Sequence, residues 1–135
     1  MEFGKYKFWR LPIFSDKRGN LCAVEFSQLP FKPKRAYFLY GNKAQRGGHA
    51  HRNEQEVFVC AAGSFRATVH DGKKGKQFMM SKPGSALYTS KMIWHSFDRF
   101  SKNAVMIAIS STPYRGQKGY IMDFDIFKKI CAKSS

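Results

Sequence analysis

Residues 46–63 read RGGHAHRNEQEVFVCAAG, and this stretch decides the fold. Residues i and i+2 of a β-strand lie on the same face, so His49 and His51 point together while Ala50 points away. Glu56 follows His51 by five residues, and Gly63 follows Glu56 by seven. The stretch therefore predicts a strand that carries two imidazoles on one face, followed closely by a carboxylate and a turn.

Short apolar runs recur on both sides of this stretch, separated by turn residues, as in a β-sandwich or barrel. After residues 65–70, in which apolar and polar side chains alternate, Asp71-Gly72 favours a hairpin turn. The apolar residues of 124–131 fall at helical spacing and predict a short amphipathic helix that packs on the barrel. The expected strands are 36–40, 57–60, 65–70, 86–89 and 105–109.

The length and composition predict one globular domain over residues 1–135. Hydrophobic residues make up 43% of the chain and aromatic residues 16%, which excludes a disordered protein. Residues 1–10 contain no apolar signal-peptide core, and no apolar run approaches the ~18 residues of a membrane span. The three cysteines lack CxxC spacing, which argues against a disulfide framework or a cysteine zinc site. We therefore expect a cytoplasmic protein.

The chain is strongly basic, with 24 Lys+Arg against 9 Asp+Glu and a formal net charge of +15. Such a field attracts nucleic acid, anionic membranes or phosphorylated metabolites. The basic residues are nevertheless scattered, and a lysine-rich solvated surface accounts for them equally well. The charge by itself does not choose between these alternatives.

The spacing His-x-His-x4-Glu-x6-Gly matches most of the first cupin motif, and Trp94-His95 stands where the second motif has its histidine. Lys43 and Arg99 stand where cupins usually have a glycine and an asparagine. The resemblance implies an all-β cupin fold, a double-stranded β-helix or jelly-roll barrel.

Three interpretations of the polar residues stay open. His49, His51, Glu56 and His95 have the donor types of a metal site. One or both of His49 and His51 could instead perform general acid–base chemistry without a metal. They could also be ordinary strand histidines.

Longer motifs make the resemblance more specific. They are DKRGNLCAVE at 16–25, LPFKPKRAY at 29–37 and RGGHAH at 46–51. Gly63-Ser64, Asp71-Gly72, Trp94-His95 and Tyr120-Ile121 follow in the same order. The chain resembles the dTDP-sugar 3,4-ketoisomerases, the FdtA/QdtA group of WxcM-like cupins. It departs from them at Glu56, where the family usually has Gln, at Ser90-Lys91 and at Gly119.

The resemblance implies an isomerase that moves the ketone of a dTDP-4-keto-6-deoxyhexose from C4 to C3 through an enediol, with no cofactor and no metal. His49 would shuttle the carbon-bound proton, and His51 would move or stabilise the oxygen-bound proton. Tyr37 would hydrogen-bond a substrate oxygen, although a core aromatic is the alternative for this residue. Non-catalytic nucleotide-sugar binding and nucleic-acid binding remain alternatives for the whole domain.

The resemblance also assigns residues to substrate binding. Arg35 and Arg46 would contact the nucleotide or its pyrophosphate, because a guanidinium fork matches phosphate oxygens; solvated surface arginines are the alternative. Arg18 and His95 match the FdtA-like branch, whose product is dTDP-3-keto-6-deoxygalactose. We therefore expect a nucleotide sugar as the partner, neither nucleic acid nor membrane, and a homodimer like those of the relatives.

Overall fold

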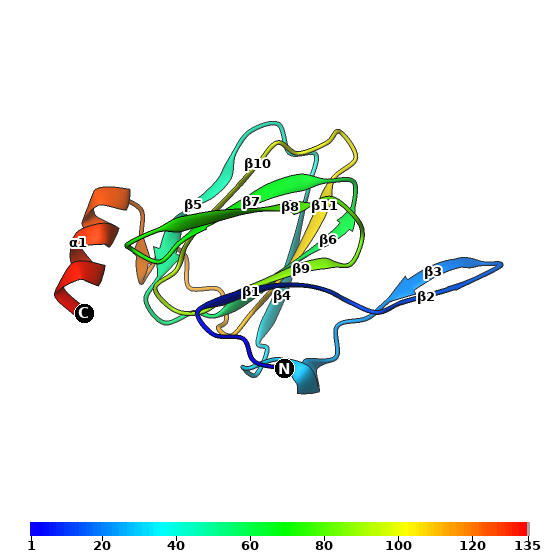
Figure 1. Ribbon diagram of the computed structural model, residues 1–135, viewed down its shortest axis with the longest axis horizontal. Coiled ribbons are helices and arrows are strands. Elements are labelled where there is room, and N and C mark those ends of the chain that lie inside the picture. The colour runs from blue at the N-terminus through cyan, green and yellow to red at the C-terminus, as the bar shows by residue number, and fades with distance from the viewer. Residues whose placement is uncertain (135) are drawn as a thin grey trace.

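The computed structural model describes residues 1–134 and consists mainly of β-strands, as Figure 1 shows. In chain order, the elements are β1 (Tyr6–Arg10), β2 (Ile13–Asp16), β3 (Gly19–Cys22), a 3₁₀ turn (Phe26–Gln28), β4 (Arg35–Tyr40), β5 (Arg46–His51), β6 (Glu56–Ala62), β7 (Phe65–His70), β8 (Gly75–Met80), β9 (Ser85–Thr89), β10 (Trp94–Asp98), β11 (Val105–Ser110), β12 (Tyr120–Ile121) and α1 (Phe124–Ser134). One sheet has the order β1-β9-β6-β11-β4 and the other β12-β5-β10-β7-β8. These antiparallel sheets confirm the predicted all-β jelly-roll barrel.

Apolar side chains from both sheets fill the space between them. In β7, Phe65, Ala67 and Val69 are fully buried, while the residues between them are partly exposed, as the alternating pattern predicts. Burying one such large apolar side chain contributes roughly 1.5–3 kcal/mol. Phe58 and Phe97 from opposite sheets meet at 4.7 Å between ring centroids. This core closes one end of the space in which the histidines lie.

Helix α1 packs beside β5 and β12 at one end of the second sheet (Figure 1), which confirms the predicted C-terminal helix. The carboxylate of Asp123 accepts a hydrogen bond from the backbone N–H of Ile126 and so caps the first turn. Phe127 is fully buried against Ala50, whose side chain points away from the barrel interior. Trp94 contributes its ring to the same apolar cluster.

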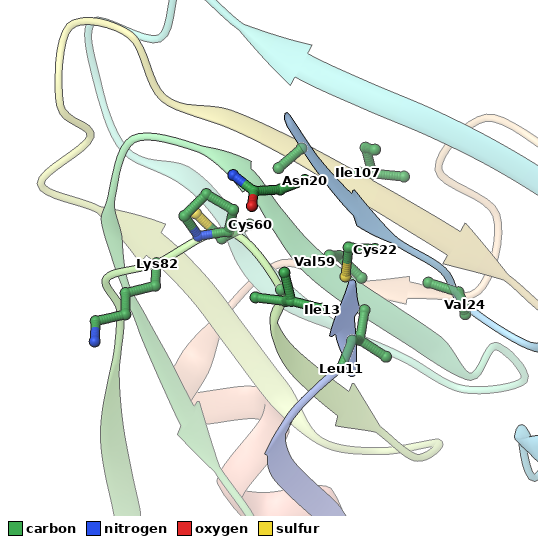
Figure 2. Close-up of a pocket in the computed structure, with 12 residues that line it drawn as sticks. Leu11, Ile13, Asn20, Cys22, Val24, Val59, Cys60, Lys82 and Ile107 are labelled. Carbon is green, nitrogen blue, oxygen red and sulfur yellow. The ribbon is translucent and has the colours of Figure 1, made fainter. Parts of the chain in front are cut away.

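A hairpin of β2 and β3 projects from the barrel and was not predicted from the sequence (Figure 1). Its apolar side chains Phe14 and Leu21 are 64% and 60% exposed. A pocket of about 650 Å³ lies between the base of this hairpin and the outer face of the first sheet (Figure 2). Its wall includes Leu11, Ile13, Cys22, Val24, Val59 and Ile107.

Strand β5 approaches β10 unusually closely at Gly47. This residue has φ = +77°, and a Cβ added there would lie 2.9 Å from the carbonyl oxygen of His95. The pairing register places His49 directly opposite His95, with an irregularity between His95 and Ser96. A glycine at this position therefore lets two histidines from different strands face each other.

Among the described residues, no helix has the length and hydrophobicity needed to cross a lipid bilayer.

Candidate active site

Three histidines meet inside the barrel. His49 and His51 extend from β5 and His95 from β10, with ring centroids 4.7 Å apart for His49–His51, 4.9 Å for His49–His95 and 5.1 Å for His51–His95. His51 and His95 are buried, and His49 is partly exposed. The structure thus brings together the two strand motifs that the sequence separates by more than forty residues.

Glu56 lies at the base of this cluster and is fully buried. Its Oε1 atom is 2.8 Å from Nε2 of His51 and 3.6 Å from Nε2 of His95. Its Oε2 atom accepts a hydrogen bond of 2.6 Å from the hydroxyl group of Tyr37, which lies on β4. This carboxylate therefore lies between the phenol, which donates a hydrogen bond to it, and the Nε2 atom of His51.

A second buried carboxylate, Glu54, lies on the other side of His51. Its Oε2 atom is 3.3 Å from Nε2 of His51. Its Oε1 atom accepts a hydrogen bond from the hydroxyl group of Thr112 and lies 3.4 Å from Nη2 of Arg35. His51 thus faces two carboxylates through the same ring nitrogen.

Burial and mutual repulsion keep two of the imidazoles neutral. Burial lowers the pKa of His49 to about 4, and the electrostatic interaction with the neighbouring His51 imidazole adds to this effect. Burial also holds the pKa of His95 well below its usual value, and both neighbouring histidines add to this effect. Nδ1 of His95 lies 3.1 Å from the carbonyl oxygen of Ile93, so Nδ1 carries the ring hydrogen. The neutral His49 can accept a proton at pH 7.

The phenol of Tyr37 is also held in its protonated form. Burial raises its pKa, and the nearby carboxylate of Glu56 raises it further. The hydroxyl group is therefore a hydrogen-bond donor that lies within reach of the histidine cluster. Buried donors of this kind can stabilise an oxygen that gains negative charge during a reaction.

Two cavities border the cluster. His49 and His95 line the first, of about 160 Å³, together with Tyr37 and Arg46. Nε of Arg46 donates a hydrogen bond of 3.1 Å to the side chain of Asn42. The second cavity, of about 180 Å³, is lined by residues that include His51, Glu54, Thr112, Arg115 and Tyr120.

The family model for FdtA, described as WxcM-like, C-terminal, matches residues 4–132. The chain belongs to this family. A curated TDP-4-oxo-6-deoxy-alpha-D-glucose-3,4-oxoisomerase from Aneurinibacillus thermoaerophilus is 36% identical over 121 residues, which are 87% of this chain and 86% of that protein. These matches confirm the family resemblance found in the sequence motifs.

Solved structures of WxcM-like relatives have the same fold. A 3,4-ketoisomerase from Helicobacter canadensis is 30% identical, with a TM-score of 0.87 over 97% of this chain and 99% of that one. The WlaRB TDP-quinovose 3,4-ketoisomerase from Campylobacter jejuni is also 30% identical, with a TM-score of 0.86 over 94% and 99% of the two chains. The predicted class of enzyme, an isomerase of the 3,4-ketoisomerase type, is thereby confirmed.

The arginines expected to bind substrate lie in different surroundings in this WxcM-like domain. The guanidinium group of Arg35 lies over the rings of Tyr37 and Tyr114, at 5.3 and 5.6 Å. Arg46 borders the first cavity. The side chain of Arg18 is 90% exposed on the β2–β3 hairpin and pairs with Asp16 at 2.6 Å. Within one chain, the structure does not bring Arg18 to the histidines.

Three residues of the site were not assigned a role from the sequence: Glu54, Thr112 and Tyr120. The ring of Tyr120 stacks on that of His49, with centroids 4.8 Å apart, and Tyr120 pairs with His51 across the β12–β5 ladder. The Tyr120-Ile121 pair was recognised only as part of a motif. Nothing in the sequence around Glu54 or Thr112 indicates that they meet.

The donor atoms of the cluster also match those of a metal site. The three imidazoles place ligand atoms within 4.8 Å of one another, and so do His51, Glu54 and Glu56. Imidazole and carboxylate donors together suit several divalent metals. The geometry therefore leaves both the metal-dependent and the metal-free interpretation open.

Proposed function

We propose that this WxcM-like enzyme converts dTDP-4-keto-6-deoxyglucose into a dTDP-3-keto-6-deoxyhexose. The observation that carries the proposal is the neutral His49 beside His51, an imidazole that faces two carboxylates. Groups in different environments can divide the roles of base and acid between them. The relatives, which are named as enzymes that isomerise such sugars, support the same substrate class.

The proposed reaction moves two protons and needs no oxidant. His49 takes the proton from C3, and the electron pair of that C–H bond forms the C3=C4 double bond. The C4 carbonyl oxygen gains a proton from Tyr37 or His51, which completes the enediol. The C3 hydroxyl group then loses its proton to the group that protonated the C4 oxygen, the C3 carbonyl forms, and His49 returns to C4 the proton that it took from C3. General acid–base groups typically contribute ~10²–10⁴-fold to such a rate.

Arg35 and Arg46 are the proposed contacts to the nucleotide diphosphate. Arg46 borders the cavity that His49 lines, and Arg35 adjoins Tyr37. A guanidinium group can form two parallel hydrogen bonds to phosphate oxygens. Binding of the diphosphate at these two residues would direct the sugar towards the histidines.

We also propose a homodimer in which the β2–β3 hairpin of each chain packs on the other. An isolated two-stranded hairpin is marginally stable in water, and this one exposes Phe14 and Leu21. The outer face of the first sheet exposes a second apolar area at Phe38 and Tyr40, whose rings stack at 5.9 Å. In such a dimer, Arg18 would reach the site of the second chain.

With Arg18 and His95 both at the site, we propose dTDP-3-keto-6-deoxygalactose as the product, as in the FdtA-like branch. Donors on one face of the enediol would set the configuration at C4. The absence of a metal, the cytoplasmic location and the lack of nucleic-acid or membrane partners stay predictions.

The test is to incubate the chain with dTDP-4-keto-6-deoxyglucose and to follow the sugar by NMR from the first minutes. A new 3-keto species with the galacto configuration is the expected result. No conversion by the folded protein would refute the proposed function, and an early gluco product alone would refute the stereochemical part. Light scattering coupled to size-exclusion chromatography tests the dimer, which a monomeric mass would exclude.

A further inference from the structure

The Nε2 atom of His51 lies between two buried carboxylate oxygens. Oε1 of Glu56 is 2.8 Å away and Oε2 of Glu54 is 3.3 Å away. Within residues 1–134, Nε2 of His51 and both of these oxygens lack a hydrogen bond of good geometry, so the three atoms are close to one another but otherwise unpartnered. A buried carboxylate oxygen without a donor is costly, so both oxygens favour a hydrogen on this nitrogen.

Groups outside the histidine cluster hold Glu54 in place. The hydroxyl group of Thr112, which follows β11, donates to its Oε1 atom, and Nη2 of Arg35 on β4 lies 3.4 Å from the same atom. Glu54 is itself only 7% exposed, although it lies in the turn between β5 and β6. This arrangement directs the remaining oxygen of Glu54 at His51.

The two carboxylates are not equivalent. Oε2 of Glu56 accepts a hydrogen bond from the hydroxyl group of Tyr37. In the proposed reaction this hydroxyl group would exchange a proton with the substrate, which would change the hydrogen bond to Glu56. Glu54 has no such link to the phenol and instead adjoins the charge of Arg35. The contact of Glu54 with Nε2 of His51 can therefore persist while the hydrogen bond between Tyr37 and Glu56 changes during the reaction.

We propose that Glu54 is a positioning residue which, together with Glu56, holds the hydrogen of His51 on Nε2 and leaves Nδ1 free to accept an oxygen-bound proton of the substrate and then to return it. A neutral imidazole carries one hydrogen, and an acceptor at one nitrogen fixes the tautomer. Both ring nitrogens of His51 are buried and lack a hydrogen bond of good geometry within the described chain, but the two carboxylate oxygens lie at Nε2. The inference rests on the proposed function, in which His51 moves the oxygen-bound proton.

The test compares Glu54→Gln and Thr112→Val with the wild type. The chain has four histidines, so ¹⁵N-histidine labelling gives a simple NMR spectrum in which the ring nitrogens of His51 can be assigned. We expect the Nε2–H form in the wild type and a mixture of tautomers in Glu54→Gln. At metal sites, loss of a group that orients a ligating imidazole typically lowers affinity or activity by about 10–100-fold, and we use the lower end as the guide for His51. Because Glu56 still faces His51 in Glu54→Gln, we expect kcat to fall by a factor near the lower end of this range. KM should stay within about twofold of the wild-type value.

Thr112→Val keeps the carboxylate but removes its anchor, so it should shift the tautomers in the same direction by a smaller amount. Glu2→Gln, which removes one carboxylate at an exposed position, is the matched control and should change neither the spectrum nor kcat. If Glu54→Gln does not fold, Glu54→Asp and Thr112→Val decide the question by the same NMR signals.

An unchanged His51 spectrum in folded Glu54→Gln would overturn the inference, and so would a rise in KM at constant kcat. A wild-type protein that converts no substrate would refute the proposed function instead. The NMR comparison does not depend on turnover, so the two failures can be told apart.

Discussion

Lowering the pH from 7 to 5 should leave the isomerisation rate nearly unchanged, because the imidazole of His49 stays deprotonated over this whole range. Burial lowers the pKa of His49 to about 4, and the electrostatic interaction with the His51 imidazole contributes. A base with this pKa is about 90% neutral at pH 5, whereas one with an ordinary imidazole pKa of about 6.5 is about 3% neutral. The two cases differ by about 30-fold in kcat/KM at pH 5.

The assay is the initial rate of ketone transfer, measured by NMR between pH 4 and 8, with kcat/KM taken as the property of the free enzyme. Circular dichroism at each pH must show a folded protein. This control matters because unfolded His49 gains a proton below pH 6.5 while the folded form does not, so the free energy of unfolding falls as the pH falls from about 6.5 to about 4. Activity should return when a sample is brought back to pH 7. A midpoint near pH 6.5 in folded protein would refute the reasoning.

Four further results are expected. His49→Asn should lower kcat by ~10²–10⁴-fold while a dTDP titration shows binding within a few-fold of the wild type; an unchanged rate would contradict the role of the base. Tyr37→Phe, which removes the hydroxyl group bonded to Glu56, should lower kcat by a smaller factor in the same NMR assay. Gly47→Ala should cost roughly 1–3 kcal/mol in urea denaturation, and more than Gly41→Ala, which has a similar φ but an open space for its Cβ. Enzyme stripped with EDTA and checked by elemental analysis should keep its rate, because a metal-bound imidazole nitrogen cannot accept a proton; activity restored by Mn²⁺, Zn²⁺ or Ni²⁺ would make His49 a ligand.

The barrel strands could be predicted because their periodicity reflects burial in one core. Residues 65–70 alternate since one face of β7 lines the interior, and residues 124–131 follow helical spacing since one face of α1 packs on the sheet. The β2–β3 hairpin gives no such pattern. Both of its strands are exposed throughout within one chain, so no core imposes a period on residues 13–22.

The same reasoning separates the predictable and unpredictable parts of the site. The relation of His49 to His51 is local, because the pleat of a strand fixes which side chains share a face. The hydrogen bond between Thr112 and Glu54 spans 58 residues and joins two segments outside the strands. No periodicity applies to such segments, so only the folded structure reveals that Thr112 holds a carboxylate beside His51.

The roles of the three histidines follow from their surroundings and not from their spacing. His49 borders a cavity and has a lowered pKa, which suits a base that meets the substrate. His51 faces two carboxylates, which suits a group that carries or passes on a proton. His95 is fixed by the carbonyl oxygen of Ile93 and is more deeply buried than His49. Each environment selects one protonation state, so the three identical side chains have different roles. A change to the groups around one histidine should therefore impair the site even when all three imidazoles remain.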